Sequence, residues 1–160
     1  MDLGAPLAAL IVCACACTPP PDFVTDRGVA FYLSGSTFIG KEEANAQEAR
    51  FLARLDAASA FPPNEVAVCV AQTEVQVVPE GPFPCATYPG LRCAGEQYGA
   101  VLKVAAADCP YTSAFVHELT HWLQQCVDGR TDYGHLDPIW REVAAELAED
   151  GRRCTAARPP

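Results

Sequence analysis

Basic residues are scarce in this chain of 160 residues. It has 11 lysines and arginines against 20 acidic residues, a formal net charge of -9, and its only lysines are Lys41 and Lys103. A chain with so little positive charge has no basic surface for a phosphate backbone. The same deficit removes any electrostatic attraction to an anionic membrane. The composition argues against nucleic acid as a partner and leaves only apolar or covalent means of membrane attachment.

Cys-x-x-Cys pairs are absent, although the chain has nine cysteines. A redox protein that uses such a pair, or a zinc site built from cysteines, is therefore the weaker interpretation. Six cysteines lie in the part of the chain beyond the N-terminal region: Cys69, Cys85, Cys93, Cys109, Cys126 and Cys154. In an exported protein this even number predicts three disulfides, and sequence alone does not choose among about fifteen pairings.

A transmembrane-length apolar run is also missing from the N-terminal region. Residues 7–16 form an apolar stretch with the length of a signal-peptide core, which is too short to cross a bilayer. We therefore expect residues 1–17 to direct export to the bacterial cell envelope or to the outside. Val12-Cys13-Ala14-Cys15 resembles a bacterial lipoprotein box, which implies a lipid anchor at Cys15, or at Cys17 after Ala16.

One domain is expected after this segment, because a chain of this length with 50% hydrophobic residues buries one core of ordinary size. Residues 18–27 are interpreted as a proline-rich spacer and residues 28–158 as the domain. The expected elements are a strand at 28–33, a helix at 42–60, strands at 65–71 and 74–78, a disulfide-tied loop at 80–99, a strand at 100–105, a helix from 112 or 113 to 126–128 and a last helix at 137–150. These patterns predict an α+β fold, stabilised by disulfides, with a mixed sheet of about four strands packed on helices.

The segment His117-Glu118-Leu119-Thr120-His121 has the spacing of a metal site. Residues four apart lie one helical turn apart, so both imidazoles can reach one ion while Glu118 stands beside it and holds its water. On a helical wheel both histidines fall away from the stripe of apolar residues Phe115, Val116, Leu119, Trp122, Leu123 and Cys126. We expect the histidines to face a cleft or solvent. The alternative is a surface pair without function.

This segment, following a strand and a capped helix start, resembles the active-site helix of zincin metallopeptidases. The resemblance implies a small zincin-like domain with one catalytic zinc ion and a peptide or protein substrate. It also implies an edge strand that lies along the cleft and aligns an extended peptide, for which residues 100–105 are the candidate.

The third zinc ligand has two candidates. His135, in Asp132-Tyr133-Gly134-His135, resembles the third histidine of SprT/Spartan-like zincins. Glu142, with Glu146 orienting a ligating histidine, resembles the downstream glutamates of gluzincins such as thermolysin.

The wheel of the last helix favours His135. It places Glu142, Glu146 and Glu149 opposite the apolar stripe of Trp140, Val143, Ala144 and Leu147, as on a solvated face. Asp132 and Asp137 are candidate hydrogen-bond partners for a ligating imidazole.

The chemistry that follows is hydrolysis of peptide bonds, with zinc held by His117, His121 and His135. Zinc lowers the pKa of its water to about 7, and Glu118 accepts the proton as general base and returns it to the leaving amine. Tyr133 and Tyr111 are candidate donors for the developing oxyanion. The alternative function is a surface lipoprotein without catalytic activity, in which zinc and disulfides only stabilise the fold.

Overall fold

The computed structural model describes residues 19–37, 39–106 and 114–157, and only the backbone at 151 and 154–157. Its helices are α1 (Lys41–Ala57), α2 (Pro63–Val70), α3 (Phe115–Asp128) and α4 (Ile139–Ala157). Its strands are β1 (Phe23–Val24), β2 (Ala30–Tyr32), β3 (Glu74–Val78), β4 (Phe83–Pro84), β5 (Arg92–Cys93), β6 (Gly95–Tyr98) and β7 (Val101–Ala105). The predicted α+β class is confirmed.

Five strands form a mixed sheet in the order β1-β2-β3-β7-β6, one strand more than the four or so expected. β2, β3 and β7 run parallel, whereas the outer strands β1 and β6 pair antiparallel with their neighbours. In the register of β3 with β7, Val75 lies opposite Leu102 and Val77 opposite Val104, and all four side chains are buried. Because side chains alternate between the faces of a strand, these residues give the sheet one apolar face.

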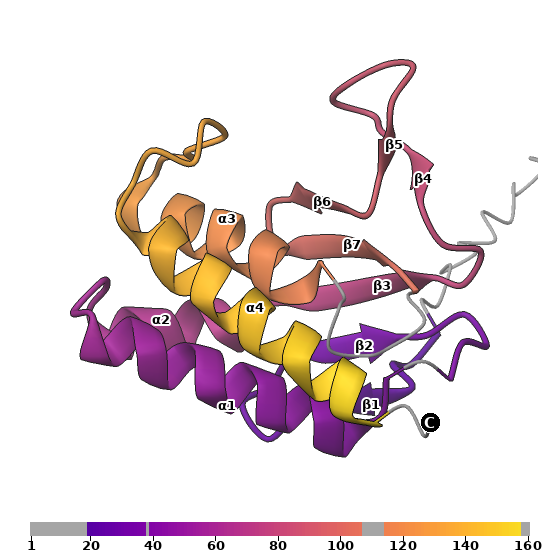
Figure 1. Ribbon diagram of the computed structural model, residues 1–160, viewed down its shortest axis with the longest axis horizontal. Coiled ribbons are helices and arrows are strands. Elements are labelled where there is room, and N and C mark those ends of the chain that lie inside the picture. Colours follow the sequence, from indigo (N-terminus) through magenta and orange to yellow (C-terminus); the bar gives the residue numbers. More distant parts are fainter. Residues whose placement is uncertain (1–18, 38, 107–113, 158–160) are drawn as a thin grey trace, which may run out of the picture.

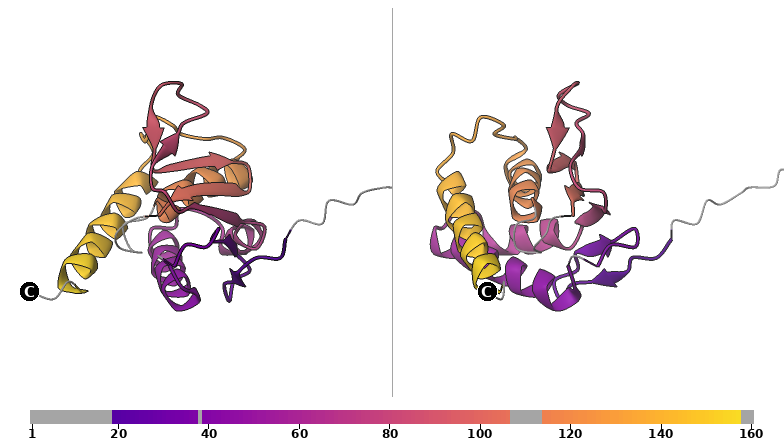
Figure 2. Two further views of the ribbon diagram at one scale, coloured as in Figure 1. Left: turned by 90° about the vertical axis from the view of Figure 1, so that its right-hand side faces the viewer. Right: turned by 45° about the vertical axis from the view of Figure 1, so that its right-hand side comes forward.

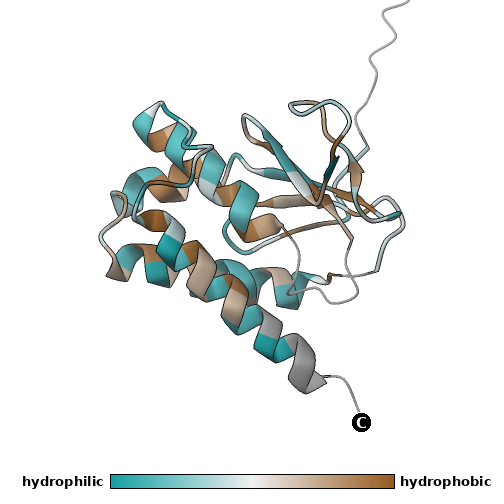
Figure 3. Cartoon of the chain, turned by 45° about the horizontal axis from the view of Figure 1, so that its top comes forward, coloured by the Kyte–Doolittle hydropathy of each residue, from teal (hydrophilic) through white to brown (hydrophobic). Residues whose placement is uncertain are grey.

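Helix α3 packs on the sheet, α1, α2 and α4 pack on α3, and α1 and α4 pack on each other (Figures 1 and 2). Hydrophilic and hydrophobic residues occupy different faces of the helices in Figure 3. The core is rich in large side chains that are fully buried, among them Phe31, Phe51, Leu55, Leu102, Phe115, Leu119 and Leu123. On the other face of the sheet Gln76 is exposed and Lys103 is half-buried, with its Nζ 4.3 Å from the centre of the Phe83 ring. The layer order therefore places α3 directly against β6 and β7.

The predicted strand at 65–71 is wrong, because this segment forms α2. Pro63 occupies the start of the helix, where its missing N–H costs nothing and its fixed φ is favourable. Val66, Cys69 and Val70 follow the helical spacing and are buried, whereas Val68 is exposed. The valines of this segment were interpreted as strand formers, but Val66 and Val70 lie on the buried face of the helix and only Val68 is exposed.

The folded region begins before residue 28, since β1 lies inside the predicted spacer and pairs with β2. Phe23 stacks on Phe31 with ring centres 4.7 Å apart, which joins this segment to the core. The export and lipid-anchor predictions for residues 1–17 lie outside the described residues. Among the helices that the structure describes, none is long and apolar enough to cross a membrane.

Two disulfides connect described cysteines. Cys69–Cys126 joins α2 to α3, and Cys85–Cys93 closes the loop between β4 and β5. Of the other two cysteines expected to pair, Cys109 lies outside the described residues and Cys154 is described only by its backbone. A third disulfide therefore stays a prediction.

Ion pairs join α1 to α4. Arg50 Nε and Arg54 Nε lie 3.0 and 2.7 Å from the two carboxylate oxygens of Glu146, and Arg50 also pairs with Asp150 at 2.7 Å. Glu146 is fully buried, so its predicted place on a solvated face is wrong. A helical wheel uses only the sequence of one helix, so it cannot show that two arginines of α1 face Glu146.

Candidate metal centre and cleft

Two histidines project from α3 one turn apart. The Nε2 atoms of His117 and His121 lie 3.2 Å apart, and both rings line a cleft, as the wheel predicts. His121 is buried and His117 is half-buried. The opposite side of α3 is fixed to the rest of the molecule, because Leu119 and Leu123 are fully buried in the core and Cys126 forms a disulfide with Cys69 of α2. The histidines are therefore fixed by packing that lies away from the cleft.

A third histidine comes from the loop between α3 and α4, residues 129–138. His135 Nε2 lies 3.3 Å from His121 Nε2, and one nitrogen from each of His117, His121 and His135 lies within 4.8 Å of the others. The indole of Trp140 on α4 lies against all three rings, with centres 5.0, 4.7 and 4.0 Å from those of His117, His121 and His135. These three histidines, the His triad below, form a group that could hold a metal ion.

Asp132 organises the loop that carries His135. Its carboxylate accepts the backbone N–H of Asp137 at 2.6 Å, and its carbonyl accepts the backbone N–H of His135 at 3.2 Å. His135 has a φ of 55°, in the left-handed region that residues other than glycine seldom adopt. Such strain persists only where the surroundings hold it, and it is enriched at functional sites.

Asp132 and Asp137 were predicted to accept a hydrogen bond from a ligating imidazole, but in the structure their carboxylates have other partners. Asp132 is engaged by the backbone of its own loop. Asp137 caps α4 by accepting the backbone N–H of Ile139 at 3.1 Å, and its carboxylate pairs with Arg130 at 2.8 Å. Both aspartates therefore position His135 through the backbone of the loop.

Glu142, the competing ligand candidate, lies elsewhere. It lines a separate hollow of about 250 Å³ together with Phe61 and Arg130. Glu146 is engaged by Arg50 and Arg54 on α1. The structure thus brings His135, and not these glutamates, to the two histidines of α3.

The electrostatics of the cleft favour neutral imidazoles at His117 and His121. Burial, with a smaller contribution from the neighbouring His135, lowers the pKa of His117 to about 4. Burial likewise lowers the pKa of His121 to about 4, with contributions from His117 and His135. Both rings are therefore neutral at pH 7 and have a lone pair for a metal ion.

Glu118 lies between α3 and β6. It is 6% exposed, and a Cβ atom added at Gly95 would be only 2.5 Å from Glu118 Oε1 and 2.6 Å from Ala114 Cβ. Burial raises the pKa of Glu118 to about 7, and the negative charge of Glu96 adds to the shift. A carboxyl group with this pKa can both accept and return a proton near neutral pH.

The cleft runs between the His triad and β6. Its part beside the triad has a volume of about 150 Å³ and is lined by Thr87, Tyr88, Cys93, Gly95, Glu96, Gln97, His117, Glu118, His121, Tyr133 and His135. An adjoining hollow of about 370 Å³ shares Cys93, Gly95, His117 and Glu118 with it and adds the apolar side chains of Ala94, Ala114 and Leu147. Glu118 is thus reached from both parts of the cleft.

The strand beside the cleft is β6, which corrects the prediction that residues 100–105 form it. Those residues form β7, which lies inside the sheet between β3 and β6. β6 has the sequence Gly-Glu-Gln-Tyr, without an apolar alternation, inside a segment of glycine, proline and cysteine that was interpreted as a loop. The sequence offers no clear signal for this strand.

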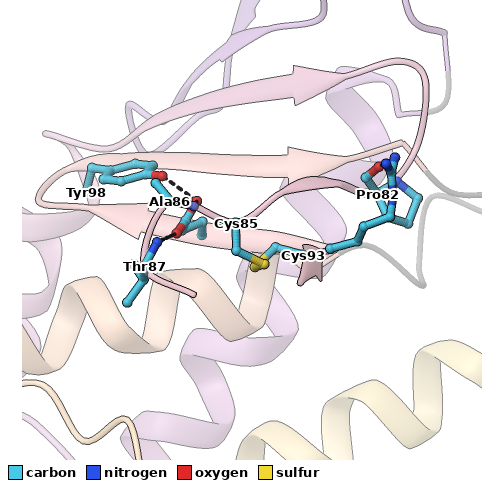
Figure 4. The surroundings of a disulfide bond; sticks show 8 residues. Pro82, Cys85, Ala86, Thr87, Cys93 and Tyr98 are labelled. Atoms are coloured by element: carbon cyan, nitrogen blue, oxygen red, sulfur yellow. Dashed lines mark hydrogen bonds between the residues drawn. A yellow bond between two sulfur atoms is a disulfide. The ribbon is translucent and has the colours of Figure 1, made fainter. Parts of the chain in front are cut away.

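Glu96 attaches the disulfide loop, residues 85–93, to β6. Its carboxylate accepts the backbone N–H groups of Ala86 and Thr87 at 3.1 and 2.7 Å and the Tyr98 hydroxyl. Figure 4 shows these three partners on the side of the Cys85–Cys93 disulfide away from Pro82. Burial alone would raise the pKa of Glu96, but the hydrogen bonds outweigh it and lower the pKa to about 2. Glu96 is therefore a fixed negative charge at the cleft.

Comparison with protein-family models, with curated proteins and with solved structures gave no match to this chain.

Proposed function

We propose that this protein is an exported, zinc-dependent metallopeptidase with a zincin-like active site. The observation that carries the proposal is the convergence of three imidazoles beside a buried carboxyl group, at one edge of an open cleft. Zinc fits this donor set, since imidazole nitrogen is one of its usual ligands and catalytic sites keep three protein ligands. Nitrogens about 2.0–2.1 Å from one ion in tetrahedral geometry lie roughly 3.3 Å apart, close to the Nε2 separations of 3.2 and 3.3 Å.

His117, His121 and His135 would hold the ion, and Trp140 would keep their rings in place. When bound, zinc supplies a Lewis acid that polarises a carbonyl group and makes water more acidic. Glu118 accepts the proton of the attacking water and returns it to the nitrogen of the leaving amine. A pKa of about 7 suits both transfers, because neither protonation state is strongly favoured at neutral pH.

Tyr133 is the described residue best placed to donate a hydrogen bond to the developing oxyanion. Its ring centre lies 5.4 Å from that of His121, and the residue lines the cleft. Tyr111, the other candidate, lies outside the described residues. A donor aimed at the charge that develops in the transition state commonly contributes several kcal/mol.

The substrate on this proposal is an extended peptide that pairs with β6. Among the described strands β6 pairs only with β7, and its other side borders the cleft. Addition of a strand to a sheet edge aligns a peptide through its main chain and leaves its side chains free for selection.

The test compares the full chain with its Glu118→Gln variant. Zinc content is measured by mass spectrometry of the metal, and cleavage by mass spectrometry of a mixed peptide library. We expect both proteins to bind one zinc ion and only the parent to cleave. An equally active Glu118→Gln variant would falsify the assigned base. Zinc binding without cleavage by either protein would favour the alternative of a non-catalytic, zinc-binding surface lipoprotein.

Export and lipid attachment are tested separately, in bacterial cells. The full chain is expressed with a labelled fatty acid, and the membrane and soluble fractions are compared with those of Cys15→Ser and Cys17→Ser variants. We expect label in the membrane fraction and its loss in one of the two variants. A protein that stays unlabelled and soluble inside the cell contradicts this part of the proposal.

A further inference from the structure

Exposed hydrophobic residues are concentrated on the segments that border the cleft. The structure describes seven exposed large hydrophobic residues, and five of them lie on β6, on the disulfide loop or on the loop that carries His135: Tyr88, Leu91, Tyr98, Tyr133 and Leu136. Leu136, next to His135, is 88% exposed, and Leu91 is 62% exposed. Single exposed hydrophobic residues need no explanation, but a cluster beside a cleft marks an interaction surface. We call these five residues the apolar rim.

The two loops of the apolar rim rise from the same side of the molecule (Figures 1 and 2). The disulfide loop stands beside β6, and the loop of residues 129–138 stands at the end of α3. Tyr88 of the first loop and Tyr133 of the second both line the part of the cleft that contains the His triad. A chain lying in the cleft therefore meets an aromatic side chain from each loop.

Both loops are held in place without a ligand. The disulfide loop is closed by Cys85–Cys93 and attached to β6 through Glu96. The other loop is folded around the carboxylate of Asp132. Because the rim is fixed in advance, a partner does not have to order it on binding, and less of the binding free energy is lost.

The charges of the cleft select against acidic partners. Its described lining contains no lysine or arginine, and its acidic side chains are Glu96 and Glu118. The pKa of Glu96 is about 2, so this residue is negatively charged at any physiological pH. A substrate carboxylate beside Glu96 would therefore meet like charge, and the described lining offers it no lysine or arginine as a partner.

We infer that the apolar rim selects an extended polypeptide segment that carries large apolar side chains next to the cleaved bond and lacks acidic residues there. The inference rests on the proposed function, and it assigns Tyr88 and Leu91 as specificity-determining residues. The occupant is an extended segment because the rim continues a cleft that runs along a strand at the sheet edge.

The experiment measures binding without turnover. The Glu118→Gln variant of the full chain is loaded with zinc and titrated with fluorescent peptides that differ only beside the bond, with leucine or phenylalanine, with serine or with aspartate. We expect the apolar peptides to bind at least roughly tenfold more tightly than the serine peptide, with aspartate weakest. Tyr88→Ala or Leu91→Ser in this background should weaken apolar binding roughly fivefold and should weaken serine-peptide binding less, so that the preference for apolar peptides shrinks.

Val68→Ala is the matched control, because Val68 is 59% exposed on α2, which contributes no residue to the described cleft lining. It should bind every peptide as the parent does, and thermal melting checks that all variants fold. Equal binding of the three peptide classes, or rim variants that match the control, overturns the inference. So does self-association of the zinc-loaded chain in ultracentrifugation that Leu136→Ser abolishes, because the rim would then bind a second copy.

The two proposals fail in different ways. If the parent cleaves peptides without preference for apolar residues, the inference fails and the proposed function stands. If apolar peptides bind selectively but the zinc-loaded parent cleaves none of them, the inference stands and the proposed peptidase activity fails.

Discussion

Glu118 and Gly95 are in such close contact that no side chain can be added at position 95 without movement of the carboxylate. A Cβ atom there would be 2.5 Å from Glu118 Oε1 and 2.7 Å from its Cγ. The glycine therefore brings the backbone of β6 against the proposed general base and fixes its place between strand and helix.

Gly95→Ala should consequently lower activity far more than it lowers zinc binding. The added methyl group displaces Glu118 or pushes α3 from the sheet, so we expect a loss of roughly a hundredfold in kcat/KM, because small misplacements of catalytic groups are costly. Overpacking should also lower the free energy of unfolding by about 1–3 kcal/mol. Gly134→Ala is the control, since its nearest neighbour would be an ordinary 3.5 Å away. Unchanged kcat/KM in Gly95→Ala would show that Glu118 is not held as proposed.

Removal of His135 should weaken zinc binding, and removal of Glu142 should not. His135→Ala removes one of the three nitrogen ligands that the His triad offers, whereas Glu142 lines a different hollow. We expect a loss of at least a hundredfold in zinc affinity for His135→Ala, measured by competition with a chelator. The opposite ranking of the two variants would restore Glu142 as the ligand.

The attachment of the disulfide loop should depend on pH through Glu96. The pKa of Glu96 is lowered to about 2 in the folded state, from 4.5, so its stabilisation is present above about pH 4.5 and is lost as the pH falls toward 2. Glu96→Gln should lower the free energy of unfolding by roughly 2 kcal/mol at pH 7, because charged hydrogen bonds are lost. The difference in free energy of unfolding between the parent and Glu96→Gln, measured by denaturant titration, should decrease as the pH falls from 4.5 to 2.5. The exposed Glu80, changed to glutamine, should show no such trend.

Loss of the Cys69–Cys126 disulfide should affect stability and spare the metal centre. The bond spans 57 residues and joins α2 to the side of α3 away from the cleft. A loop of this size predicts a loss of about 4 kcal/mol in Cys69→Ala/Cys126→Ala, measured by urea unfolding. Zinc affinity at 10 °C, where the variant stays folded, should match that of the parent. A parallel loss of zinc affinity would mean that the disulfide also positions the triad.

Local patterns were enough to identify the histidines of α3. His117 and His121 are separated by one helical turn, and the buried stripe of the same helix shows which way they face. The structure brings His135 to them, but the solvated face predicted for Glu146 is wrong. Glu146 is buried against Arg50 and Arg54, a pairing between residues about 95 apart that no wheel of one helix can register.

The rest of the cleft depends on long-range contacts that leave little trace in the sequence. Gly95 and Glu96 belong to a strand with no apolar alternation. The role of Gly95 depends on its contact with Glu118, and the role of Glu96 depends on its hydrogen bonds to the disulfide loop. The segment that forms α2 shows the opposite problem. Its valines suit a strand, and only packing on α3 decides in favour of a helix.

The order of the strands has a consequence for a molecule tethered to lipid. The chain enters the sheet at β1, and the cleft lies beside β6 at the opposite edge, about 19 Å away across four strand spacings. With an acyl group on Cys17, the six residues up to Phe23 would reach at most about 20 Å when fully extended. On the proposed anchoring, the β1 edge of the sheet would stay within this distance of the bilayer, and the cleft would lie at the edge farthest from the tether.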